Sequence, residues 1–175
     1  MPFTPFHFGP AAAIKAIAGG YFSFMTFGFS QVLIDLESLY YLVQGESYVH
    51  RFLHTYIGAT LVVVFSVIVG KPICEIALNL WNLTLSPKEK HLLHIKPKIP
   101  LIAAISGCAF GAYSHVFLDS IMHSDIRPLS PFNTNNELLQ IISLGELHLY
   151  CAISGVFGVM VLSVIYFWNK WTYEI

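Results

Sequence analysis

The sequence predicts an all-α protein: a polytopic membrane helical bundle of about four to five membrane-embedded helices that forms a single domain over residues 1–175. Of its residues, 55% are hydrophobic and only 11% are charged, whereas about 25% of the residues in a soluble domain are charged. Three stretches without Asp, Glu, Lys or Arg are long enough to cross a hydrocarbon core of about 30 Å. These stretches are residues 52–70, 99–118 and 147–168.

The N-terminal apolar segment, residues 8–34, has a single charged residue and is interrupted by Gly19 and Gly20. It lacks the basic start of a removable signal peptide, so we expect it to be retained. One long tilted helix is compatible with its length. We favour a broken or re-entrant N-terminal helix, over about residues 10–18 and then 21–43, because two glycines inside a helix cost about 2 kcal/mol relative to alanines. Such a break is tolerated at membrane depth where it lines an enclosed cavity.

Basic residues are concentrated in the loop between the first two uncharged stretches. Four of the nine Lys and Arg residues lie there: Lys88, Lys90, Lys96 and Lys98. The positive-inside rule makes this side cytoplasmic, so residues 35–51 and 119–146 fall at the non-cytoplasmic face. We therefore expect an integral protein of the bacterial inner (plasma) membrane. The net charge of −1, without a basic run, predicts no nucleic acid binding.

Ionisable side chains from three separate segments reach the predicted non-cytoplasmic face. They are Asp35 and Glu37, then His50, Arg51 and His54, and finally His115, Asp119 and His123. His7 joins them if the N-terminal helix is broken, because a single span would carry it about 40 Å from Asp35 at 1.5 Å per residue. Ionisable groups in membrane spans are costly, and they normally face a bundle interior where they pair, bind ions or do chemistry.

The spacing of these residues favours a metal site. Residues four apart lie on one face of a helix, so His50 with His54, and His115 with Asp119, would each offer two ligands. Neutral imidazole and carboxylate groups bind zinc and related transition metals. The expected ligands or their immediate neighbours are His7, Asp35, His50, His54, His115 and Asp119. A further carboxylate, from Asp35, Glu37 or Asp125, would orient a ligating histidine. The alternative for each pair is a hydrogen-bonded helix end.

We assign the catalytic roles to Asp35, Arg51, His115 and Asp119. Arg51 has a planar guanidinium suited to an anionic, phosphate-containing substrate, although an interfacial anchor is an equal alternative. The expected cofactor is a divalent transition metal, zinc first and manganese second, with one or two ions bound. Metal coordination lowers the pKa of water toward neutrality and makes it a nucleophile. The site would therefore be hydrolytic.

The order of these motifs resembles the LexA-regulated, membrane-bound predicted metal-dependent hydrolases. The matching elements are His7, Asp35 with Glu37, His50-Arg51 followed by His54-Thr55, Ser114-His115 followed by Asp119, and the loop "IRPLSPF". The resemblance covers about residues 1–132, and it departs at residues 34–38, where Ile-Asp-Leu-Glu-Ser replaces the family's Pro-Asp-x-Asp-His. His115, Asp119 and His123 are also similar to the zinc-binding helix of the zinc-dependent phospholipase C and S1/P1 nuclease group. That likeness implies phosphoester hydrolysis.

These observations together predict a membrane-bound metal-dependent hydrolase acting on a phosphoester, including one in a lipid. Its expected partners are the lipid bilayer and a phosphoester or lipid-like substrate, and nothing in the sequence indicates an oligomeric state. The alternative is a non-catalytic integral membrane subunit of a larger complex, or a proton- or metal-ion-conducting protein. A conducting protein is expected to carry ionisable groups along a path through the membrane, whereas these groups collect at one end.

Overall fold

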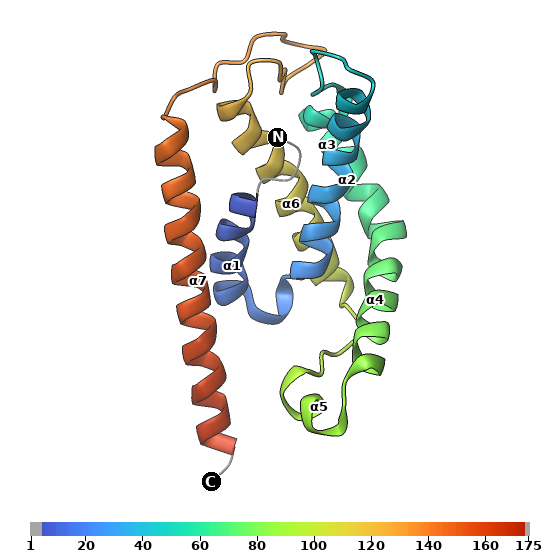
Figure 1. The fold of residues 1–175 in the computed structure, drawn as a ribbon, viewed down its shortest axis with the longest axis vertical. Coiled ribbons are helices and arrows are strands. Elements are labelled where there is room, and N and C mark those ends of the chain that lie inside the picture. Colours follow the sequence, from blue (N-terminus) through green and yellow to red (C-terminus); the bar gives the residue numbers. More distant parts are fainter. Residues whose placement is uncertain (1–4, 174–175) are drawn as a thin grey trace.

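Helices make up almost all of the regular structure. The computed structural model describes residues 5–173 and contains no strand within them (Figure 1). Its helices are η1 (Pro5–His7), α1 (Phe8–Ala18), η2 (Gly19–Tyr21), α2 (Phe24–Val43), η3 (Phe52–His54), α3 (Tyr56–Phe65), η4 (Ser66–Gly70), α4 (Lys71–Thr84), α5 (Pro87–Leu93), α6 (Leu101–Met122) and α7 (Leu144–Tyr173). The predicted all-α class is confirmed.

Three of the described helices are long and apolar enough to cross a membrane. They are the continuous helix α3–η4–α4 (Tyr56–Thr84), α6, and the Leu144–Trp168 part of α7. This number is somewhat lower than the four to five membrane-embedded helices predicted, a count that included the two N-terminal helices. In the structure, α1 and α2 form a hairpin beside the spanning helices (Figure 1). The first span also continues to Thr84, well beyond the predicted end at residue 70.

The N-terminal apolar segment is broken at the two glycines, as predicted. Gly19 adopts a φ of +52° at the end of α1, in a region of conformational space that side chains other than glycine rarely enter. Lys15 then closes the turn, because its Nζ donates hydrogen bonds to the carbonyl oxygens of Gly19 and Phe22 at 2.8 and 2.7 Å. The helix α2 begins after Ser23, whose Oγ accepts a hydrogen bond from the Thr26 amide. The chain therefore reverses between α1 and α2.

Small residues allow this hairpin to approach its neighbours closely. On α7, a Cβ atom added at Gly158 would collide with the backbone of Ala12 in α1, and one at Gly9 in α1 would collide with the Cys151 carbonyl of α7. On α6, a Cβ at Gly107 or Gly111 would collide with α2. Glycine-mediated contact of this kind is typical of packing between membrane helices. The result is that α6 lies against α2, while α1 lies against α7.

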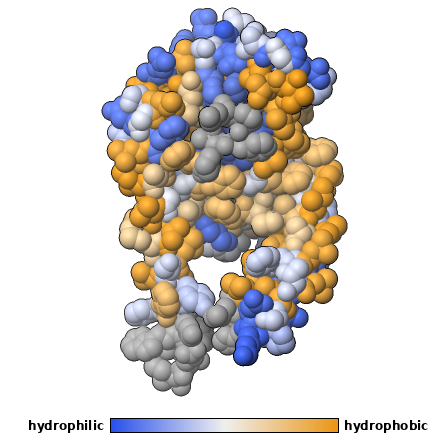
Figure 2. Space-filling view, in the orientation of Figure 1, coloured by the Kyte–Doolittle hydropathy of each residue, from blue (hydrophilic) through white to orange (hydrophobic). Residues whose placement is uncertain are grey.

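The surface separates into polar ends and an apolar middle (Figure 2). Large apolar side chains are exposed along the helices, for example Leu61 and Ile68 on the first span and Val159 and Phe167 on α7. Polar residues gather at the end where α2, α6 and the 123–143 loop meet, and again beside α5 (Figures 1 and 2). An apolar belt between two polar ends fits an integral membrane protein.

Candidate metal centre

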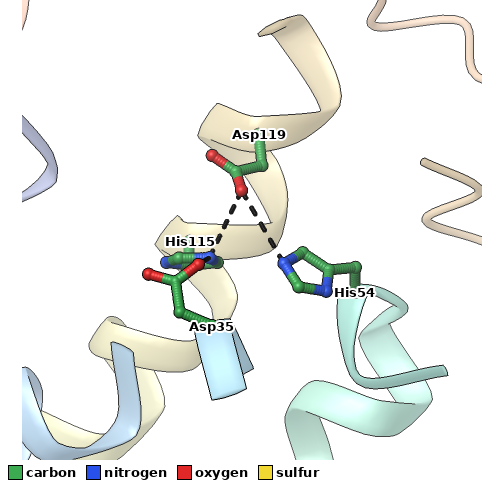
Figure 3. A group of neighbouring side chains, drawn as sticks. All are labelled: Asp35, His54, His115 and Asp119. Carbon is green, nitrogen blue, oxygen red and sulfur yellow. Dashed lines mark ion pairs between the residues drawn. The ribbon is translucent and has the colours of Figure 1, made fainter. Parts of the chain in front are cut away.

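Four of the predicted site residues meet in the interior of the bundle. Asp35 of α2, His54 of η3, and His115 and Asp119 of α6 each offer one ligand atom, and these atoms all lie within 4.8 Å of one another (Figure 3). All four side chains are buried. We call these four residues the buried group.

The centre of the buried group is the pair on α6. His115 and Asp119 lie one helical turn apart, as predicted, and His115 Nε2 is 3.3 Å from Asp119 Oδ2 (Figure 3). Asp35 reaches the same nitrogen from α2, with its Oδ1 at 3.3 Å. His54 approaches from the opposite side, with Nε2 at 3.8 Å from Asp119 Oδ2. Three separate segments therefore direct nitrogen and oxygen ligands to one place.

His7 lies beside this group, as the broken helix predicts. Its Nε2 is 3.2 Å from Asp119 Oδ1, and its ring centroid is 5.0 Å from that of His115. Despite the short distance, His7 Nε2 and Asp119 Oδ1 are not in hydrogen-bonding geometry, and both atoms are buried without a hydrogen-bond partner, as is His115 Nε2. A buried polar atom left without a partner costs about 1–3 kcal/mol. A cation bound among these atoms would remove that cost.

Both histidines of the buried group have their Nδ1 atom held by an acceptor. Nδ1 of His115 is 2.8 Å from Gln31 Oε1, and Nδ1 of His54 is 3.3 Å from Glu37 Oε2. Glu37 also accepts the backbone N–H groups of Arg51 and Leu53, so it fixes η3 to α2. Acceptors on the far nitrogen are the usual partners of a metal-binding histidine, because they set its tautomer and orientation.

The hydrogen bonds of Gln31 determine the tautomer of His115. The Gln31 amide nitrogen donates to the Gly111 carbonyl at 3.0 Å, so its oxygen must face His115 and accept a hydrogen bond from Nδ1–H. In a neutral His115 the lone pair of Nε2 then points toward the carboxylates of Asp35 and Asp119. Two carboxylates and a lone pair repel one another unless a positive charge, either a proton on Nε2 or a bound metal ion, lies between them. The geometry suits a cation.

The histidines at the edge of the centre are in the neutral form that a metal requires. Burial lowers the pKa of His7 to about 4, even though the Asp119 carboxylate opposes this shift. Burial likewise lowers the pKa of His54, and this outweighs the opposing effect of the hydrogen bond that His54 donates to Glu37. Both imidazoles are therefore uncharged at neutral pH.

His50 departs from the predicted arrangement. The sequence predicts His50 and His54 on one helix, but the chain has no regular structure at residue 50 and α3 begins only at Tyr56. The reason is that carboxylates take the backbone N–H groups of this segment. Asp125 Oδ2 accepts those of Val49 and His50, both at 3.1 Å, and no α-helix forms until Thr55 caps α3 by accepting a hydrogen bond from the Gly58 N–H. His50 nevertheless remains near His54, with ring centroids 4.6 Å apart.

His123 does not share the helix of His115 and Asp119, although the likeness to a zinc-binding helix implies that it would. The helix α6 ends at Met122, and His123 has extended backbone angles. Its ring instead lies 4.3 Å from that of His50. Asp125 follows two residues later and accepts hydrogen bonds from the His50 ring and from the backbone. Burial raises the pKa of Asp125, but these hydrogen bonds lower the pKa by a larger amount. The pKa therefore lies below its ordinary value, and the carboxylate is ionised. His50, His123 and Asp125 thus form a neighbouring group.

Arg51 lies outside both groups. Its guanidinium pairs with Glu46 at 3.2 Å, and its Cζ lies 3.7 Å above the Tyr41 ring. It also lines a pocket of about 460 Å³ together with Arg127 and the hydroxyl-bearing residues Thr55, Ser130 and Thr134. Sequence analysis did not identify Arg127 or Gln31. Gln31 had a detectable signal, because it is a polar residue in an apolar helix, four positions before Asp35.

Comparison with known proteins gives a family but no activity. No curated protein and no solved structure matches the chain. One family model matches residues 1–174, which is nearly the whole sequence. The chain therefore belongs to the family described as "Domain of unknown function (DUF4184)".

Proposed function

We propose that this protein is a membrane-bound metal-dependent hydrolase that acts on a phosphoester. The observation that carries the proposal is the buried group, in which two carboxylates and two histidines converge and leave His115 Nε2 and Asp119 Oδ1 without hydrogen-bond partners. Histidine and carboxylate ligands suit zinc, with manganese as the alternative. The resemblance to the LexA-regulated membrane-bound hydrolases supports the same reaction class.

The site residues have two kinds of proposed role, metal binding and orientation of the ligands. His54, His115, Asp119 and Asp35 would hold the ion, and His7 lies close enough to Asp119 to complete or orient the ligand set. When bound, a divalent ion would supply Lewis acidity toward a phosphoryl oxygen and would lower the pKa of water toward that of a nucleophile. Gln31 and Glu37 keep the histidines in the ligating tautomer. The surrounding apolar helices limit the access of bulk water, which strengthens electrostatic interactions within the site.

The pocket lined by Arg51 and Arg127 suits a phosphate group. Guanidinium groups bind phosphate oxygens through paired N–H donors, and the hydroxyls of Thr55, Ser130 and Thr134 line the same space. Thr55 directly follows His54, so the pocket adjoins the buried group along the chain. Phe52 on the pocket wall is exposed. A phosphoester with an apolar part, such as a lipid, could place its phosphate against the guanidinium and hydroxyl groups and its apolar part against Phe52.

Hydrolysis should depend on metal. Protein purified without a histidine tag is assayed with a chromogenic phosphomonoester, a chromogenic phosphodiester and a glycerophospholipid in mixed micelles. We expect turnover of at least one of them, its loss after chelation, and its recovery with Zn²⁺ or Mn²⁺, because the ion generates the nucleophile. Folded protein that neither contains metal nor takes up Zn²⁺ or Mn²⁺ would contradict the proposal.

We infer further that the metal centre faces the non-cytoplasmic side of a bacterial inner membrane. The lysine-rich loop around α5 lies at the opposite end of the bundle from the centre (Figure 1), and the positive-inside rule makes that end cytoplasmic. The three native cysteines are buried, so they give little background to an impermeant thiol reagent. On intact cells, Asn135→Cys should be labelled and Ser86→Cys should not. The reverse pattern would place the centre in the cytoplasm.

A further inference from the structure

The group formed by His50, His123 and Asp125 lies at the more exposed side of the centre. One ligand atom from each residue lies within 4.8 Å of the others. His123 and Asp125 are half-buried, whereas every side chain of the buried group is buried. Two imidazoles and one carboxylate are a common ligand set of catalytic zinc sites, in which further coordination positions stay open to water or substrate. We call these three residues the half-exposed group.

Its residues are fixed by contacts from three different segments. Asp125 binds the His50 ring at 2.8 Å through Oδ1, and through Oδ2 it accepts the backbone N–H groups of Val49 and His50. Asn136 donates from its Nδ2 to the carbonyl oxygens of Ser120 and His123, at 2.8 and 3.3 Å. These bonds hold the end of α6 and the 44–51 segment in one arrangement. The ligands are therefore positioned in advance, which reduces the entropic cost of binding an ion.

The two groups adjoin each other through His50. Its ring centroid lies 4.6 Å from that of His54 in the buried group and 4.3 Å from that of His123. Nδ1 of His50 and Oδ1 of Asp125 share one proton at 2.8 Å, and an ion bound by both atoms would take the place of that proton. Neighbouring metal ions are a recurrent arrangement in enzymes that cleave phosphoesters, where they hold the attacking and leaving oxygens.

We propose that the half-exposed group is a second divalent transition-metal site, so that the centre binds two ions. The proposal rests on the proposed function for the identity of the metal. The buried group binds the more tightly held ion, because it offers four ligand residues shielded from water. The half-exposed group binds the second, more readily exchanged ion and presents it to substrate.

Metal stoichiometry tests this proposal directly. Full-length protein in detergent, without a histidine tag, is equilibrated with Zn²⁺, passed through a desalting column and measured by elemental analysis. We expect about two equivalents in the wild type and about one in His123→Ala and in Asp125→Asn. His94→Ala should retain two, because His94 is exposed at the end of α5. Circular dichroism of each variant establishes that it is folded.

Other results would overturn the second site in distinguishable ways. A wild type with one equivalent that persists in both variants removes the second site and leaves the proposed function intact. One equivalent that disappears in the folded variants means that the two groups form a single site. A folded wild type that binds no metal overturns the proposed function as well. If His123→Ala does not fold, His123→Gln, which retains a polar side chain, gives the same comparison.

Discussion

Replacement of His115 with alanine should remove the ion from the buried group and abolish hydrolysis. Its Nε2 lies 3.3 Å from a carboxylate oxygen of both Asp35 and Asp119, so the substitution removes a nitrogen ligand that lies between two carboxylate ligands. Loss of a residue that merely orients a ligand costs about 10–100-fold in metal affinity. Loss of the ligand itself should therefore cost more than about 100-fold. Elemental analysis and the chelator-sensitive assay measure the two effects.

The matched control is His94→Ala. His94 is also a histidine, but it is exposed at the end of α5. The helix α5 lies at the opposite end of the bundle from the part of α6 that precedes the 123–143 loop and carries the centre (Figure 1). This variant should keep its metal and its turnover. A His115→Ala protein that folds and retains full metal content in the buried group would show that this histidine is only a packing residue, as in the hydrogen-bonded helix-end alternative.

The fold follows closely from short-range features of the sequence. The uncharged stretches predict the spanning helices because backbone groups in a bilayer must be satisfied internally, which a helix does. The break in the N-terminal segment follows from Gly19 and Gly20, because Gly19 adopts a positive φ there. Lys15 is the one charged residue of that segment, and its role as a cap of the turn depends on the fold. It could not be derived from spacing alone.

Only part of the centre could be derived in the same way. His115 and Asp119 lie on one long helix, so their spacing of four predicts their contact. His50 and His54 have the same spacing but precede α3, because carboxylates from other segments accept hydrogen bonds from the backbone N–H groups around His50 and His54. Asp125 is separated from His50 by 75 residues, and Gln31 is separated from His115 by 84. Contacts at such separations depend on the packing of the whole bundle.

Gln31 leads to the second prediction with a large expected effect. Gln31→Met keeps the length and apolar stem of the side chain but removes the acceptor that holds His115 Nδ1–H and the donor to the Gly111 carbonyl. The Gly111 carbonyl still accepts a hydrogen bond from the Ser114 hydroxyl in this variant, so we expect little change in the structure of α6. His115 would lose its fixed tautomer and ring orientation. We expect metal affinity in the buried group to fall by about 10–100-fold.

Competition with a chromogenic chelator gives this affinity for the wild type, Gln31→Met and the control Gln44→Met. Gln44 is exposed at the end of α2, so the control makes the same chemical change on the same helix without touching His115. A fall of about 10–100-fold corresponds to about 1.4–2.7 kcal/mol of binding free energy. Gln31 bonds the Nδ1 atom of His115, so the expected effect acts through the orientation of that imidazole. If Gln31→Met and Gln44→Met bind the metal with equal affinity, a carboxylate, and not Gln31, positions the imidazole of His115.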